Sequence, residues 1–397
     1  MSVSKRMLSL SPSLTLAVSA KAKAMKEAGE NVISFGVGEP NFNTPEHIIR
    51  AAIDAMEKGY TKYTPSSGLP ALRKLICRKF EKDNNLHYEP SQIIVSNGAK
   101  HSIFNALFAL LDDGDEVILP SPYWVTYPEV VKVCGGVVVP VLGERSNQFK
   151  VTAEQIERAI TEKTKLLILN SPANPTGAVY TEEEIRAIAA VCERAGIYVL
   201  SDEIYEKLIY NGTKPFSIAC VSDYMKEHTI VVNGVSKTYA MTGWRLGYLA
   251  APKDIAKAID SFQSHATSNA SSITQYATIA ALEGPEEETR RMVSIFNERR
   301  LKMMEMLDAH PDLQYVRPDG AFYVMLTVDH FYGKHCDGKL IDGSVSFCDA
   351  LLEKVKVAAV PGIAFGDDGC VRLSYSLSME DMVEGLRRIE TFVESLD

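Results

Sequence analysis

The sequence predicts an α/β protein: a large domain built on a mostly parallel, seven-stranded sheet flanked by helices, and a smaller α+β domain formed by both chain ends. Between roughly residues 45 and 250, short β-branched runs alternate with amphipathic helical stretches, which is the rhythm of α/β proteins. Several of the runs are uniformly apolar, as strands covered on both faces require. After about residue 310 the pattern changes, and we expect a second domain there.

The individual elements follow from local composition. Helical stretches separate the runs, for example Lys100 to Leu111, and Thr181 to Arg194, which opens like a capping box. Intervening helices imply right-handed crossovers and therefore a largely parallel sheet. The expected strands are Gln92 to Ser96, Glu116 to Pro120, Gly136 to Val141, Leu166 to Asn170, Ile197 to Ser201, Thr229 to Asn233 and Leu246 to Ala250.

The second domain is expected after a long helix from about Pro285 to His310. A Gly-Ala-Phe-Tyr-Val segment, a helical pattern and a strand-like run from Cys370 to Tyr375 follow it. The first 45 residues lack a strong periodic pattern, and we expect them to pack on this domain. The predicted division is therefore 46–310 for the large domain, and 1–45 with 311–397 for the small one.

Composition excludes several classes of function. With 46% hydrophobic and 23% charged residues, the 397-residue chain has an ordinary globular composition. A net charge of -9 and the lack of a basic block argue against a nucleic-acid surface. Seven scattered cysteines without a C-x-x-C pair fit a reducing cytosol. No metal site is expected. No leader or membrane-spanning run is recognisable, so we expect a cytoplasmic protein. Its expected partners are small molecules.

The most informative segment runs from Gly234 to Gly247, with the sequence Gly-Val-Ser-Lys-Thr-Tyr-Ala-Met-Thr-Gly-Trp-Arg-Leu-Gly. Lys237 stands there among small and apolar residues after an apolar strand. A lysine so placed loses its proton more easily than an exposed one, which a Schiff-base nucleophile requires. Arg245 could supply a fixed cation for a phosphate. A lone lysine in such a turn would ordinarily be a solvated residue.

Three further segments carry polar residues at strand ends. Asn174 lies in Asn-Ser-Pro-Ala-Asn-Pro-Thr-Gly, and Asp202 and Tyr205 lie in Ser-Asp-Glu-Ile-Tyr. Gly98 and Ala99 lie between a strand and a helix, where small residues leave the first backbone N–H groups of the helix open to an anion. Taken singly, each segment could be a turn, a helix cap or an ordinary strand-to-helix connection.

Together, and in their order along the chain, the four segments resemble the class I and II aminotransferases, which use pyridoxal 5'-phosphate. The resemblance covers nearly the whole chain and is strongest to the bacterial and plant subgroup of aspartate aminotransferases that includes bifunctional aspartate/prephenate enzymes. It implies that Lys237 binds the cofactor covalently and is the catalytic base. The cofactor-binding residues that it implies are Gly98, Ala99, Trp124, Asn174, Asp202, Tyr205, Ser236, Lys237 and Arg245, with Tyr63 reaching in from the other subunit of a homodimer.

The resemblance also implies how the substrate is bound. Arg372 corresponds to the arginine that holds the α-carboxylate, and Gly38 contacts the same end of the substrate. Lys100 corresponds to a lysine that meets the distal carboxylate, and Thr15 to a threonine of prephenate-competent members. Trp124 and Asn174 complete this expected set.

The expected function is therefore an aspartate aminotransferase with a ping-pong mechanism, and conversion of prephenate to arogenate is the additional reaction that the resemblance suggests. Another aminotransferase, or a lyase that uses the same cofactor, remains the alternative because the cofactor-binding residues alone do not fix which bond breaks. Transcription regulators with a related domain need a DNA-binding module in front. Only about 45 residues precede the α/β region here, without a helix-turn-helix pattern.

Overall fold

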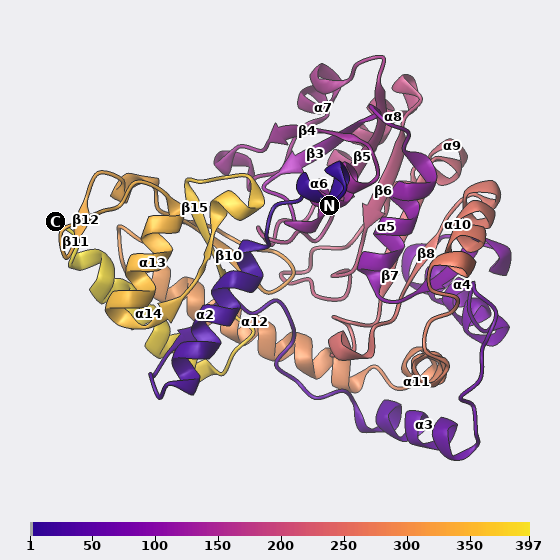
Figure 1. Cartoon of the computed structure of the whole chain (residues 1–397), viewed down its shortest axis with the longest axis horizontal. Coiled ribbons are helices and arrows are strands. Elements are labelled where there is room, and N and C mark those ends of the chain that lie inside the picture. Colours follow the sequence, from indigo (N-terminus) through magenta and orange to yellow (C-terminus); the bar gives the residue numbers. More distant parts are fainter. Residues whose placement is uncertain (1–2) are drawn as a thin grey trace.

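The central element of the computed structural model, which describes residues 3–397, is a seven-stranded sheet in the order β2-β8-β7-β6-β5-β3-β4 (Figure 1). All seven expected strands are confirmed. Strand β8 runs antiparallel to β2 and β7, and the other neighbours are parallel, so the sheet is mostly parallel as expected. The strands are β2 (Ile93–Ser96), β3 (Glu116–Ser121), β4 (Val137–Leu142), β5 (Thr164–Asn170), β6 (Tyr198–Asp202), β7 (Thr229–Gly234) and β8 (Gly247–Ala250).

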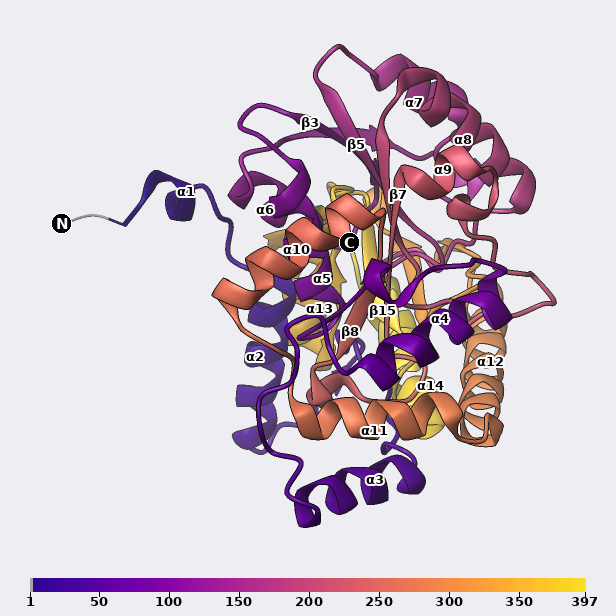
Figure 2. The same ribbon diagram turned by 90° about the vertical axis from the view of Figure 1, so that its right-hand side faces the viewer.

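Helices cover both faces of this sheet. Leu166 and Ile168 of β5 belong to a buried cluster with α5 and α10, whereas Leu167 and Leu169 belong to another with α7, α8 and α9. This alternation explains why the central strands are apolar throughout. The helices are α3 (Glu46–Glu57), α4 (Pro70–Asn84), α5 (Ala99–Leu110), α6 (Thr126–Val133), α7 (Ala153–Ala159), α8 (Glu182–Ala195), α9 (Asp223–Glu227), α10 (Lys253–Ala266) and α11 (Ser272–Glu283). Figure 2 shows α3, α4 and α11 together at one edge of the molecule.

A second, antiparallel sheet has the order β14-β15-β10-β9. In it, Tyr323 of β10 pairs with Ser374 of β15, and Met325 with Arg372. The long helix α12 (Glu287–Asp308) leads from the large sheet into this region, as expected. Its strands and helices are β9 (Tyr315–Val316), β10 (Tyr323–Thr327), α13 (Ser344–Val355), β14 (Val360–Pro361), β15 (Cys370–Ser374) and α14 (Met379–Glu394), with a small hairpin of β11 (His335–Cys336) and β12 (Lys339–Leu340).

Part of the N-terminal segment packs on this second region: α2 (Leu14–Glu27) lies against it, and β1 (Ile33–Ser34) pairs in parallel with β13 (Val357–Ala358). In contrast to the expectation, α1 (Lys5–Leu8) lies against α6, and the backbone N–H of Ser11 donates to Glu129 of α6 at 2.9 Å. The sequence did not predict α2, because Ala22 is its one buried residue and a mostly exposed helix has little apolar periodicity. The division of the chain at residues 45 and 310 stays a prediction. No helix within residues 3–397 is both long and apolar enough to cross a membrane.

Candidate active site

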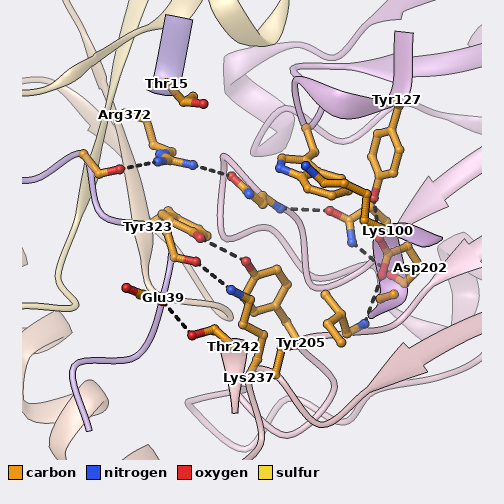
Figure 3. Close-up of a pocket in the computed structure, with 18 of the residues that line it drawn as sticks. Thr15, Glu39, Lys100, Tyr127, Asp202, Tyr205, Lys237, Thr242, Tyr323 and Arg372 are labelled. Carbon is orange, nitrogen blue, oxygen red and sulfur yellow. Dashed lines mark hydrogen bonds between the residues drawn. The ribbon is translucent and has the colours of Figure 1, made fainter. Parts of the chain in front are cut away.

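A pocket of about 520 Å³ lies where β5, β6 and β7 end, facing β10, β15 and α2 (Figure 3). This is the expected position for a ligand in an α/β sheet, at the carboxyl ends of parallel strands. The predicted site residues that line it are Thr15, Gly38, Ala99, Lys100, Trp124, Asn174, Asp202, Tyr205, Ser236, Lys237, Arg245 and Arg372. Gly98 borders it next to Ala99. Tyr63 lies outside it, with a side chain that is 90% exposed.

Lys237 enters the pocket from the loop after β7, a strand whose residues are all buried. Its Nζ donates a hydrogen bond to the carbonyl oxygen of Gly38 at 2.6 Å. The pKa of Lys237 is lowered to about 8, chiefly by burial and also by the cations of Arg372 and Arg245, against the opposing effect of the Glu39 and Asp202 carboxylates. The amine is therefore far more often neutral than that of an exposed lysine, and a neutral amine is the nucleophilic form.

Asp202 is the last residue of β6 and is 3% exposed. Its Oδ2 accepts a hydrogen bond from the hydroxyl of Tyr127 at 2.7 Å, and its Oδ1 accepts one from the backbone N–H of Ile204 at 3.2 Å. Burial raises the pKa of Asp202 to about 6, although both hydrogen bonds favour the ionised form. A cationic partner in the pocket would compensate the buried carboxylate.

A chain of hydrogen bonds connects Asp202 to Arg372. The side chain of Asn170 donates to the carbonyl oxygen of Asp202 at 2.9 Å and accepts from the backbone N–H of Asn174 at 2.9 Å. Asn174 Oδ1 in turn accepts from Arg372 Nη1 at 2.9 Å. The two strand ends and the small sheet are thus held in register around the pocket.

The turn before α5 has the geometry of an anion-binding site. Gly98 is the N-cap residue of α5 and has a φ of 90°. A side chain at this φ would be strained, and a Cβ atom there would lie 2.2 Å from Nη2 of Arg245, so the guanidinium would have to shift. Ala99, the first residue of α5, lines the pocket together with Arg245 and Ser236, and a helix start beside a guanidinium suits a phosphate.

Arg372 is 3% exposed and has no carboxylate partner among the described residues. Besides Asn174 it binds the carbonyl oxygen of Gly36 through Nη2 at 3.0 Å, and its buried Nε makes no hydrogen bond within residues 3–397. Burial lowers its pKa. A buried guanidinium that has no ion-pair partner within residues 3–397 and keeps an unbonded N–H group strongly favours the binding of a carboxylate ligand.

Lys100 supplies a second cation to the same pocket from the first turn of α5. Its Nζ lies 4.9 Å from the centroid of the Trp124 ring, and partial burial together with Arg245 lowers its pKa. Thr15 reaches the pocket from α2, with its hydroxyl 2.9 Å from that of Ser13. The pocket can therefore hold a ligand that has an anionic group at each of two ends.

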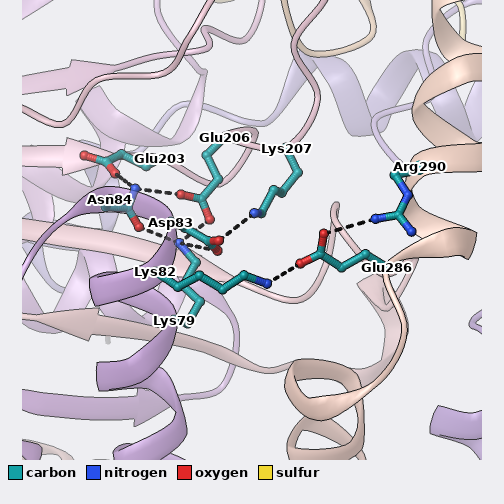
Figure 4. Close-up of polar contacts among 9 residues, drawn as sticks. All are labelled: Lys79, Lys82, Asp83, Asn84, Glu203, Glu206, Lys207, Glu286 and Arg290. Carbon is teal, nitrogen blue, oxygen red and sulfur yellow. Dashed lines mark hydrogen bonds and ion pairs between the residues drawn. The ribbon is translucent and has the colours of Figure 1, made fainter.

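A polar cluster on the far side of the β6 end supports the turn that carries Asp202 and Tyr205 (Figure 4). Glu206, next to Tyr205, forms a buried ion pair with Lys79 of α4 and accepts from Asn84 at 2.9 Å. The cluster continues through the ion pairs Lys207–Asp83, Lys82–Glu286 and Arg290–Glu286. Ile204 and Tyr205 thus line the pocket while Glu206 and Lys207 pair with α4, and the turn is held from both sides.

Sequence reasoning missed three residues that shape the pocket. Tyr127 holds Asp202, Asn170 joins Asp202 to Asn174, and Tyr323 lies between Tyr205 and the guanidinium of Arg372. The spacing of Tyr127 three residues after Trp124, at the start of a helix, was a usable signal. The position of Tyr323 depends on strand pairing between β10 and β15, and no local pattern reveals it.

Comparisons with known proteins agree with this geometry. A family model described as aminotransferase class I and II matches residues 30–389. The chain is 50% identical over 395 residues to the aspartate aminotransferase of Geobacillus stearothermophilus, with 100% of both chains covered. It is 45% identical over 396 residues to a probable aspartate/prephenate aminotransferase of Aquifex aeolicus, with 99% of each covered. The fold superposes with a TM-score of 0.97 on the aspartate aminotransferase of Rhizobium meliloti, at 42% identity and full coverage of both chains. The TM-score is 0.92 for the Thermus thermophilus aspartate aminotransferase with maleate, at 42% identity, covering 99% of this chain and 100% of that one.

Proposed function

The chain belongs to the class I and II aminotransferase family, and we propose that it is an aspartate aminotransferase. It transfers the amino group between L-aspartate or L-glutamate and 2-oxoglutarate or oxaloacetate. The observation that carries this proposal is the presence of two cations, Arg372 and Lys100, in one pocket with Lys237. A dicarboxylic amino acid places one carboxylate on each cation and its α-carbon between them. The maleate bound by the Thermus thermophilus relative is likewise a dicarboxylate.

We propose pyridoxal 5'-phosphate as the cofactor, because the residues present fit it. Lys237 has the lowered pKa of an imine-forming amine, and Asp202 is a buried carboxylate that forms no ion pair within residues 3–397. The Gly98 turn forms a cradle that a Cβ would fill. Lys237 would hold the aldehyde carbon, Asp202 the ring nitrogen, and Gly98, Ala99, Ser236 and Arg245 the phosphate. Trp124 would lie against the ring, and Asn174 and Tyr205 would hydrogen-bond its phenolic oxygen.

The cofactor, when bound, supplies an electron sink for the bonds of the substrate α-carbon. The side chains of the pocket orient the substrate and carry the protons. Arg372 and Lys100 orient the substrate, and Asp202 keeps a proton on the ring nitrogen. Lys237, as a free amine, would be the base that accepts the proton of the substrate α-carbon and, once protonated, the acid that releases it. A second keto acid then reverses the sequence, which gives ping-pong kinetics.

We propose a homodimer in which Tyr63 reaches the phosphate of the neighbouring subunit. Tyr63 is 90% exposed in the single chain, yet its loop is well held: Gln263, itself buried, donates to the carbonyl oxygen of Ser66 at 2.7 Å. Exposed apolar residues on α1 and α2, Met7, Leu8 and Leu16, offer further surface for a partner. Sedimentation velocity tests this arrangement directly, and a monomer at micromolar concentration would contradict it. The cytoplasmic location likewise stays a prediction.

Prephenate is a second candidate amino acceptor. Thr15 lines the same pocket as Lys100, and a relative from Aquifex aeolicus has the name probable aspartate/prephenate aminotransferase. Steady-state turnover of prephenate with aspartate or glutamate as donor tests this proposal. It fails if arogenate does not form.

Product analysis tests the main proposal and separates it from a lyase. Incubation of the holoenzyme with L-aspartate and 2-oxoglutarate should yield oxaloacetate and glutamate in equal amounts. Release of free ammonia in place of glutamate would indicate elimination instead of transfer. A Lys237→Ala variant should bind the cofactor noncovalently but lack turnover, and appreciable steady-state activity of this variant would contradict the role of Lys237.

A further inference from the structure

Tyr323 lies between two groups that the proposed function assigns to different ligands. Its hydroxyl is 2.9 Å from the hydroxyl of Tyr205, and the Arg372 guanidinium carbon lies 4.4 Å from its ring centroid (Figure 3). The side chain is fully buried, and it lines the pocket. It enters from β10, the strand that pairs with the strand of Arg372. No other described residue contacts both Tyr205 and Arg372 in these ways.

We propose that Tyr323 is a positioning residue with two separable parts: its hydroxyl orients Tyr205 toward the cofactor oxygen, and its ring holds the guanidinium of Arg372 for the substrate carboxylate. This inference rests on the proposed function.

The hydroxyl pair has one productive arrangement. Tyr205 can donate to a cofactor oxygen only if it accepts from Tyr323, so Tyr323 is the donor of the pair. Burial raises the pKa of Tyr323 and Tyr205, so both hydroxyls keep their protons in the physiological range. A hydrogen bond received by Tyr205 polarises its own O–H and strengthens its donation.

The ring has a different task. Arg372 is buried without a carboxylate partner among residues 3–397, and its donors to Asn174 and Gly36 fix only two of its nitrogens. An aromatic face beside a desolvated guanidinium stabilises the cation and restricts its plane. The Tyr323 ring lies closer to the guanidinium carbon, at 4.4 Å, than the Phe365 ring, at 5.0 Å.

Two substitutions separate the parts. Tyr323→Phe removes the hydroxyl and keeps the ring, so Tyr205 becomes a weaker donor. The cofactor oxygen then carries more negative charge, and the proton beside it on the Lys237 nitrogen is retained to higher pH. The pH midpoint of the absorbance change of the bound cofactor should rise by roughly half a pH unit. The affinity for maleate, measured by calorimetry, should stay within about twofold.

Tyr323→Leu removes both parts, so it should raise the midpoint similarly and also weaken maleate binding by about tenfold. The charged groups that face Lys237 are Glu39, Asp202, Arg245 and Arg372, and neither substitution replaces any of them. Tyr315→Phe, in the neighbouring strand β9, is the matched control because its hydroxyl bonds Asp308 at 2.8 Å instead. It should change neither readout.

The decisive arm is a double-mutant cycle. If Tyr323 acts through Tyr205, then Tyr323→Phe adds no further shift of the midpoint to Tyr205→Phe. Additive shifts, an unchanged midpoint in Tyr323→Phe, or unchanged maleate affinity in Tyr323→Leu would each overturn the inference. A wild-type protein that fails to bind the cofactor or maleate would instead overturn the proposed function.

Discussion

The guanidinium of Arg372 donates from Nη1 to Oδ1 of Asn174 at 2.9 Å, across 198 residues of sequence. The residue proposed to hold the substrate carboxylate is therefore bonded to a residue proposed to hold the cofactor. The two parts of the pocket are joined before either ligand arrives, and the pre-formed geometry reduces the entropy cost of ordering them.

This pairing predicts that the shape of the cation matters as much as its charge. Arg372→Lys keeps the charge but places all donors on one nitrogen, so it loses the planar fork that bonds Asn174 through Nη1 and Gly36 through Nη2. We expect kcat/KM for aspartate to fall about a hundredfold, since charge-assisted hydrogen bonds contribute roughly 1.5–3 kcal/mol each. A loss below threefold in steady-state assays would show that the fork geometry is unimportant.

Lys100 should select dicarboxylic substrates. Lys100→Ala removes the cation for the distal carboxylate, so kcat/KM for aspartate should fall by about tenfold or more while that for alanine or phenylalanine changes little. Lys339→Ala, an exposed lysine outside the pocket, serves as control. Equal losses for all substrates would mean that Lys100 does not read the distal carboxylate.

The Gly98 turn should not tolerate a side chain. In Gly98→Ala the new Cβ would meet Arg245 at 2.2 Å in a backbone conformation that favours glycine. We expect the affinity for pyridoxal phosphate, measured by fluorescence titration, to fall by roughly tenfold or more. Gly243→Ala, in the same loop as Arg245, has no described atom within 4 Å of its Cβ position. Gly243→Ala should bind the cofactor like the wild type. Similar cofactor affinities for Gly98→Ala and Gly243→Ala would refute the close approach of Gly98 to Arg245.

The buried Asp202 carboxylate should lower the free energy of unfolding of the protein without cofactor. Its pKa is raised from 3.8 to about 6, so the ionised form is disfavoured by folding, and this cost develops as pH rises from about 4 to about 6. In Asp202→Asn the amide can keep both hydrogen bonds, to Tyr127 and to Ile204. The variant should therefore gain up to about 3 kcal/mol of unfolding free energy above pH 6, at 1.36 kcal/mol per pKa unit.

The gain should disappear below pH 4, where Asp202 is protonated and neutral in both states. Denaturant unfolding of the cofactor-free proteins between pH 4 and 8 measures it. The same variant should lose affinity for the cofactor because the ring nitrogen loses its anionic partner. A pH-independent stability difference would contradict the raised pKa.

Sequence patterns predicted the parts of this molecule that depend on local order. The strands β5 to β7 were expected almost to the residue, because a run of apolar residues buried on both faces is a local signal. Helix α2 was missed because it is largely exposed. The site residues were found through their resemblance to a family, and the structure places all but Gly98 and Tyr63 among the residues that line one pocket.

Contacts between distant strands were beyond any local pattern. Tyr323 meets Arg372 only because β10 pairs with β15, and Asn170 joins Asp202 to Asn174 only because β5 lies beside β6. The proposed contact of Tyr63 with a cofactor phosphate would require a second chain. These relationships are set by tertiary structure, and periodicity along one segment does not encode them.

The most direct test of the central claim is the absorbance spectrum of the purified holoenzyme before and after addition of L-aspartate alone, with no keto acid present. We predict that aspartate converts the bound cofactor from its pyridoxal to its pyridoxamine form and releases one equivalent of oxaloacetate per active site. A spectrum that shows bound cofactor but does not change with aspartate would contradict the assignment of Arg372 and Lys100 as the two carboxylate-binding cations.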